Sequence, residues 1–234
     1  METIDSFEDQ KLNLQQDLLR GIYNYGWEKP SYIQQRAILP ILSGKDIIIQ
    51  AQSGTGKTGT FTIGILQMIK SDQPSVQGII ILPTRELANQ VYTVMYSLSE
   101  FVNINLVKCV GGIRVKDSVP NPQRATVFIG CPGKICDVMT NQLFRCQPFD
   151  INHLVIDEFD KVLEPDFFEK IKYVFQYINP QAQVILTSAT RNQDVINLTS
   201  HFMRDPINII VNDNELTLEG IQQYFIDCQD EYNK

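Results

Sequence analysis

Short runs of apolar residues recur along the chain, and longer segments with a helical repeat separate them. The runs are rich in Ile, Val and Leu, do not alternate with polar residues, and cover residues 46–50, 78–82, 105–109, 126–129, 153–156, 183–187 and 207–211. Strands that are covered on both faces have this pattern, and parallel sheets are covered on both faces. The sequence therefore predicts seven buried strands.

The segments between these runs predict helices. Apolar residues fall at i, i+4, i+7 and i+8 from Phe61, and at i, i+4, i+7 and i+11 from Leu87. A further helical region extends from about residue 11 to 42, with breaks near Gly26 and Pro30. Alternating strands and helices predict an α/β fold with a mostly parallel open sheet and helices on both faces. Ligands of such sheets bind at the carboxyl ends of the strands, so the loops there are the candidate sites.

Composition and charge narrow the class of protein. Hydrophobic residues make up 43% of the 234 residues and charged residues 20%, which is typical of a soluble globular protein. The net charge of −7 excludes a broadly basic surface, so any nucleic-acid contact needs a local patch or backbone dipoles. Five cysteines without a C-x-x-C pair indicate reduced thiols. With no signal segment and no membrane-spanning apolar run, we expect a cytoplasmic protein, with the nucleus as the alternative.

A glycine-bearing loop, residues 51–58, joins the first predicted strand to a predicted helix. Its glycines let backbone N–H groups converge on phosphate oxygens, and the helix N-terminus adds the positive end of its dipole. The positively charged Lys57 ammonium would contact the β- and γ-phosphates of ATP, and the Thr58 hydroxyl would bind Mg²⁺. Ala51 replaces the first glycine of the general pattern, and a glycine-rich turn without a ligand is the alternative. The expected nucleotide contacts are Ser53, Gly54, Thr55, Gly56, Lys57 and Thr58.

A second acidic element follows the strand at 153–156, in the order Asp157-Glu158-Phe159-Asp160. Carboxylates at the end of a buried strand are costly unless a cation meets them, and Mg²⁺ on ATP phosphates is such a cation. Asp157 would hold the ion through water, and Glu158 would orient and deprotonate the attacking water. With Lys57, these two residues form the predicted catalytic set. An acidic helix start is the alternative.

Seven spaced motifs, in order over most of the chain, resemble those of the DEAD-box RNA helicases. They are residues 26–34, the phosphate loop, 83–87, 111–112, 131–134, 157–160 and 188–190. The resemblance implies a RecA-like P-loop domain over residues 1–211, with 212–234 as a linker or the start of a second domain. Residues 28–40 and 217–225 look most like the translation-initiation members of this family.

The resemblance assigns Trp27, Lys29 and Gln34 to adenine recognition, with Phe7 in the place of an isolated upstream aromatic residue. The Gln34 amide can both donate to and accept from the adenine edge, which would select ATP over GTP. The residues themselves leave Trp27 open as a core residue and Phe7 as a packing anchor.

The resemblance also implies a grip on the backbone of single-stranded RNA. Loop N–H groups and a few cations carry no base code, so binding is predicted to be independent of sequence. The expected RNA contacts are Thr84, Arg85, Gly112, Pro132, Gly133 and Lys134. Asp160 would contact Ser188 or Thr190 and couple the ATP state to strand separation, although a strand-end turn would also use small hydroxyl residues.

Three residues depart from the family pattern. Phe159 replaces an alanine and puts the coupling contact in question, while Cys131 replaces a threonine and Lys134 an arginine. Lysine keeps the charge but loses the bidentate fork of arginine, which weakens a phosphate contact modestly.

The family pairs this domain with a second RecA-like domain in cis, which supplies arginine fingers worth about 10³–10⁵ in rate. We therefore expect weak ATP binding, negligible ATPase activity and no unwinding from this chain alone. Translation-initiation scaffold proteins are candidate partners, and a membrane is not. A non-catalytic RNA clamp that keeps the nucleotide site is the alternative function. A P-loop kinase or GTPase would leave Gln34 and the motif at 188–190 unexplained.

Overall fold

The computed structural model describes residues 2–112, 114, 121–140, 144, 146–161, 165–190 and 202–211. Seven strands form one sheet in the order β3-β4-β2-β5-β6-β1-β7, and every neighbouring pair is parallel. Their bounds are β1 Ile47–Gln50, β2 Gly78–Ile81, β3 Leu106–Cys109, β4 Val127–Gly130, β5 His153–Ile156, β6 Gln183–Ser188 and β7 Ile207–Ile210. All seven predicted strands are confirmed to within one residue at each end.

Six α-helices lie between and before the strands. They are α1 Gln16–Asn24, α2 Tyr32–Leu42, α3 Lys57–Met68, α4 Arg85–Leu98, α5 Pro132–Met139 and α6 Pro165–Tyr177. Short 3₁₀ turns cover Pro122–Arg124 (η2), Pro148–Asp150 (η3) and Phe159–Lys161 (η4). The predicted breaks separate α1 from α2, and Gly26 there has φ 92°, which favours glycine. Among the described helices, none is both long and apolar enough to cross a membrane.

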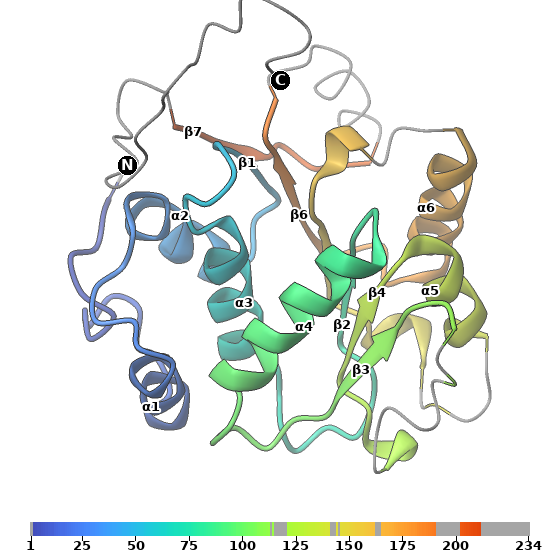
Figure 1. Ribbon diagram of the computed structural model, residues 1–234, viewed down its shortest axis with the longest axis horizontal. Coiled ribbons are helices and arrows are strands. Elements are labelled where there is room, and N and C mark those ends of the chain that lie inside the picture. The colour runs from blue at the N-terminus through green and yellow to red at the C-terminus, as the bar shows by residue number, and fades with distance from the viewer. Residues whose placement is uncertain are drawn as a thin grey trace, which may run out of the picture.

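The sheet separates two hydrophobic cores, because successive strand residues point to opposite faces. In β1, Ile47 and Ile49 belong to the core under α1–α4, whereas Ile48 belongs to the core under α5 and α6. Figure 1 shows the two groups of helices on either side of the sheet. The fold is therefore the predicted α/β sheet with helices on both faces.

Buried polar side chains at the amino ends of the strands bind the main chain. Asp46 is 2% exposed, and its carboxylate accepts the backbone N–H of Val184 at 2.9 Å and that of Arg204 at 2.7 Å. The Gln183 amide donates to the carbonyls of Ile41 at 2.8 Å and Lys45 at 2.7 Å. These bonds tie β1, β6 and the segment before β7 together at one edge.

Candidate nucleotide and RNA site

The order of strands sorts the predicted motifs into two neighbouring groups at the carboxyl edge of the sheet. The loops after β1, β5 and β6 carry the predicted nucleotide and coupling residues, and these strands are adjacent. The loops after β2, β3 and β4 carry the predicted RNA contacts, and these strands are adjacent too. Motifs that interleave along the chain thus form one nucleotide half and one RNA half.

The phosphate loop has the backbone shape that its glycines permit. Gly54 has φ 82° and Gly56 has φ 104°, both in the left-handed region. Gly56 caps the N-terminus of α3, and a Cβ there would lie 2.6 Å from Ser31 Oγ. Ser31 Oγ itself donates to the carbonyl of Thr55 at 2.9 Å. The start of α2 therefore supports the loop and leaves no room for a larger residue at Gly56.

A cleft of about 370 Å³ brings the phosphate loop and the acidic element together. Its lining includes Lys57 and Thr58 from the start of α3 and Asp157 and Glu158 from the end of β5. The Lys57 ammonium donates to the carbonyls of Ala51 and Gln52 inside its own loop. The predicted cation and the predicted carboxylates thus face one cavity.

Burial shifts the charge equilibrium of both groups. Desolvation lowers the pKa of Lys57, and the nearby carboxylates of Glu158, Asp157 and Asp160 oppose that shift. Desolvation raises the pKa of Asp157, against a hydrogen bond from Thr187 and the charge of Lys57. The desolvated charges of this cleft would be stabilised by a bound polyanion, which pairs with the lysine, and by its counter-ion, which pairs with the carboxylates.

Thr187, on β6, fixes the acidic pair. Its hydroxyl donates to Asp157 Oδ1, and the backbone N–H of Glu158 points at the same two oxygens, 3.1 Å from Asp157 Oδ1 and 3.3 Å from Thr187 Oγ1. Glu158 has φ 54°, an uncommon value for a residue with a side chain. Its carboxylate forms an ion pair with Lys161 at 2.9 Å. Sequence reasoning missed Thr187, although a hydroxyl directly after the apolar residues 184–186 was the available signal.

One face of α4 also lines the cleft, which the sequence did not indicate. Leu87, Gln90, Val91 and Val94 lie along it. Leu87 and Val94 are only half-buried, although they continue the apolar repeat of the helix. The periodicity marked these positions as core, and it cannot distinguish a core contact from the wall of a cleft.

The adenine-recognition residues occupy different environments. Trp27 lines the cleft and is half-buried. Gln34 is 4% exposed, and its Oε1 accepts the backbone N–H of Ser31 at 2.8 Å. Gln34 and the exposed Lys29 are not among the described residues that line the cleft. Phe7 is fully buried in the core, as expected of a packing anchor.

The predicted RNA residues after β2 and β3 meet each other. Thr84 caps α4, and its Oγ1 accepts the N–H of Leu87 at 3.3 Å. The exposed Arg85 follows, with Nη2 only 2.7 Å from where a Cβ on Gly111 would lie. Gly112 has φ 86°. The two glycines therefore let the guanidinium lie against the loop after β3.

The start of α5 gains a cation from another helix. Pro132 is the first residue of α5, and Cys131 caps it without a side-chain hydrogen bond. Lys134 is half-buried in the first turn. Lys170 on α6 brings its Nζ to 3.5 Å from the position of a Cβ on Gly133. Sequence reasoning missed Lys170, because no pattern in α6 relates it to the motif at 131–134.

The coupling contact is formed. Thr190 Oγ1 donates to Asp160 Oδ2 at 2.9 Å, and Ser188 Oγ donates to the carbonyl of Thr190 at 3.0 Å. Phe159 is fully buried in the core under α5 and α6, where its ring meets Phe202 edge-on at 6.1 Å. Phe159 is thus accommodated by the core, and the contact that it put in question is present.

A phosphate loop that faces a strand-end Asp-Glu pair across one cleft of a parallel sheet defines a RecA-like P-loop nucleotide-binding domain. Residues 31–198 match the DEAD/DEAH box helicase family, and the chain belongs to that family.

Curated relatives agree over nearly the whole chain. The chain is 46% identical over 98% of its length to an ATP-dependent RNA helicase eIF4A of Chaetomium globosum, of which it covers 57%. It is 44% identical over 97% of its length to eukaryotic initiation factor 4A of Caenorhabditis elegans, of which it covers 56%. The chain therefore spans little more than half the length of these relatives.

Solved structures show the same fold. A DEAD box protein from Methanococcus jannaschii has a TM-score of 0.80 at 29% identity, covering 91% of this chain and 57% of that one. Dbp5 of Saccharomyces cerevisiae bound to RNA and ADP BeF3 has a TM-score of 0.80 at 31% identity, covering 92% of this chain and 54% of that one.

Proposed function

We propose that this chain is the ATP-binding and RNA-backbone-binding half of an ATP-dependent RNA helicase that acts in translation initiation. The observation that carries the proposal is the shared cleft of Lys57, Thr58, Asp157 and Glu158. The relatives named for RNA helicase activity and for initiation support the reaction and the pathway. Because the chain spans only part of those relatives, the complete reaction is assigned to the whole protein, with a second RecA-like domain in cis.

The residues of the cleft fit a Mg²⁺ ion that enters with the nucleotide. Among the described residues, no group of three or more His, Cys, Asp or Glu side chains could hold a metal. Mg²⁺ keeps several waters and binds through one or two protein groups plus phosphate oxygens, which suits Asp157 and Thr58. When bound, the ion would neutralise charge on the β- and γ-phosphates.

Each side chain then has a distinct task. Lys57 would exchange its own loop carbonyls for the phosphates, because a triphosphate is a stronger acceptor than two amides. Glu158 is placed to accept a proton from the attacking water, and Thr187 keeps Asp157 in position. Thr190 and Asp160 connect this cleft with the loop after β6, through which nucleotide state would reach the RNA.

RNA would bind across the loops after β2, β3 and β4. Arg85, Lys134 and Lys170 supply cations there, and the starts of α4 and α5 supply backbone N–H groups. These contacts meet phosphate and sugar, so we propose sequence-independent binding of single strands. Dbp5 of Saccharomyces cerevisiae, which has the same fold, is solved bound to RNA, and this supports RNA as the ligand.

ATP hydrolysis with and without single-stranded RNA tests the proposal, on this chain and on the longest product of its gene. We expect the chain alone to bind an ATP analogue weakly with negligible turnover, and the longer product to show RNA-stimulated turnover that Glu158→Gln abolishes. A longer product whose Glu158→Gln variant turns over ATP normally contradicts the proposed catalytic role. Equal displacement of the analogue by GTP and ATP contradicts the adenine assignment.

A further inference from the structure

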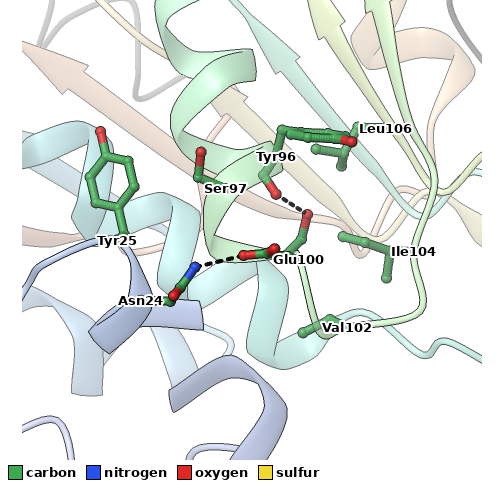
Figure 2. A pocket seen from close by; sticks show the side chains of 9 residues that line it. Asn24, Tyr25, Tyr96, Ser97, Glu100, Val102, Ile104 and Leu106 are labelled. Atoms are coloured by element: carbon green, nitrogen blue, oxygen red, sulfur yellow. Dashed lines mark hydrogen bonds between the residues drawn. The ribbon is translucent and has the colours of Figure 1, made fainter. Parts of the chain in front are cut away.

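A second hollow, of about 570 Å³, lies between the end of α1 and the C-terminal part of α4 (Figure 2). It shares no lining residue with the nucleotide cleft. Gly21 of α1 lies so close to α4 that a Cβ there would be 2.0 Å from the carbonyl oxygen of Leu98. The two helices are thus packed backbone to backbone, and the hollow between their ends is a fixed feature of the fold.

Two exposed tyrosines stand on either side of this hollow. Tyr25 is 38% exposed and Tyr96 is 63% exposed, and Figure 2 shows Glu100 between them in the view. Tyr96 stacks on Tyr92, with ring centroids 6.0 Å apart, and Tyr25 meets Trp27 edge-on at 4.9 Å. Both rings are therefore held by aromatic neighbours while keeping a free face, as in a preformed binding site.

Glu100 provides a negative charge that the described residues do not neutralise. Its carboxylate accepts from the neutral Asn24 amide at 2.7 Å and forms no ion pair with any described Lys or Arg. Two cations, one on α1 and one on β3, already lie on aromatic rings. Arg20 lies 3.9 Å from the Phe101 ring centroid, and Lys108 lies 4.4 Å from that of Tyr92.

These groups together suit a guanidinium. A planar cation can stack on the face of Tyr96 and donate to the Glu100 carboxylate with its fork, while Tyr25 bounds the other side of the hollow. The apolar side chains of Val102 and Ile104 line the same hollow and can cover the methylene stem. A phosphate group would be repelled by Glu100, and a purely apolar side chain would desolvate that carboxylate without compensation.

We propose that this hollow, the Tyr25–Tyr96 pocket, binds an arginine side chain of a protein partner. The occupant is a peptide segment rather than RNA, because the pocket carries a negative charge. The inference is independent of the proposed ATP and RNA chemistry.

The test is a titration of ¹⁵N-labelled protein with N-acetyl-arginine methylamide, followed by backbone amide shifts. We expect saturable shifts centred on residues 24–25 and 96–106, with a dissociation constant on the order of 1 mM for so small a ligand. Glu100→Gln should weaken binding about fivefold, and Tyr96→Ala by a similar factor.

Matched controls separate the pocket from general charge and aromatic effects. Asp72→Asn removes one exposed carboxylate elsewhere, and Tyr173→Ala removes an exposed tyrosine that likewise stacks on a neighbour, Tyr177. Neither should change the affinity.

Shifts that fail to saturate, that lie outside the pocket, or that persist unchanged in Glu100→Gln overturn the proposal. A leucine analogue that binds as well as the arginine analogue also overturns it, since the occupant would then be apolar. Shifts caused there by oligouridylate would point to RNA instead and overturn it equally.

Discussion

Polar side chains are buried at both edges of the parallel sheet, but their roles differ. At the amino edge, Asp46 and Gln183 bond to backbone groups of other segments. At the carboxyl edge, Lys57, Asp157 and Glu158 are 6%, 5% and 8% exposed, yet face one another across a cavity. Polar groups that bind the main chain fix the fold, whereas buried charges that face a cavity are available to a ligand. Mutations at the two edges should therefore separate stability from binding.

The largest effect on binding is expected from Lys57→Met. Loss of the ammonium should weaken binding of a fluorescent ATP analogue by about 3 kcal/mol, roughly a hundredfold. The melting temperature should stay the same or rise, because the desolvated ammonium, whose pKa burial lowers, is removed from the fold.

Lys70→Met is the matched control for Lys57→Met. Lys70 is exposed and lies two residues beyond the other end of α3, so the same change there should leave ATP affinity intact. A Lys57→Met protein that binds the analogue normally would mean that the ammonium remains with its own loop carbonyls and plays no part in binding.

Asp46→Ala should give the opposite result at the amino edge. It leaves the N–H groups of Val184 and Arg204 without their acceptor and removes an ion pair with Arg204 at 3.7 Å. Urea unfolding should show a loss of about 3 kcal/mol, with ATP affinity unchanged once the protein is folded. Asp72→Ala, at an exposed loop position, should change neither quantity. Lost affinity at normal stability would erase the distinction between the two edges.

The sequence predicted this sheet well, because each strand is a local apolar run. All seven runs became strands, and the phosphate loop lies between a strand and a helix as its glycines require. The strand order could not be predicted in the same way, since pairing of β2 with β5 or of β1 with β7 depends on contacts between distant segments. The motifs identified the chemistry of the nucleotide half without specifying which strands were neighbours.

Residues that act through tertiary contacts escaped prediction for the same reason. Thr187 reaches Asp157 only because β5 and β6 are paired, and Lys170 reaches Gly133 only because α6 packs beside α5. Gln34 shows a related case. Its motif predicts an adenine contact, which stays a prediction; its oxygen accepts the N–H at the cap of α2, and its Nε2 lies 2.5 Å from where a Cβ on Gly59 would be. Local pattern indicates the type of residue, and the packing decides what that residue touches.

The two ends of β5 allow a pH test of the comparison. His153 begins the strand at the amino edge, where burial lowers its pKa from the ordinary 6.5 to about 4. A histidine kept neutral in this way contributes stability above pH 6.5 that is lost as the pH falls toward 4. We expect wild-type protein to lose about 2 kcal/mol more between pH 7 and pH 4.5 than His153→Gln does.

Asp157, at the carboxyl end of β5, works in the opposite direction. Burial raises its pKa, so its protonation relieves a cost of folding as the pH falls. This contribution is the same in wild type and in His153→Gln. Urea unfolding at the two pH values measures the double difference. Parallel losses in wild type and His153→Gln would show that the imidazole is hydrated in the folded protein.

The smallest effect is expected from an exposed cation of the RNA half, and it decides whether that half includes α6. Lys170→Ala should weaken binding of oligouridylate about threefold and reduce the slope of log affinity against log salt by about 0.7, the loss of one phosphate contact. Lys172→Ala is the control, because Lys172 lies on the same helix but pairs with Glu169 at 2.7 Å. Fluorescence anisotropy at several salt concentrations measures both quantities.

Equal slopes for Lys170→Ala and wild type would place the phosphates beyond the reach of Lys170 and leave Lys134 as the cation at the start of α5. A changed slope for both variants would indicate a diffuse charge effect of α6, since a defined contact beside Gly133 can involve only the nearer lysine.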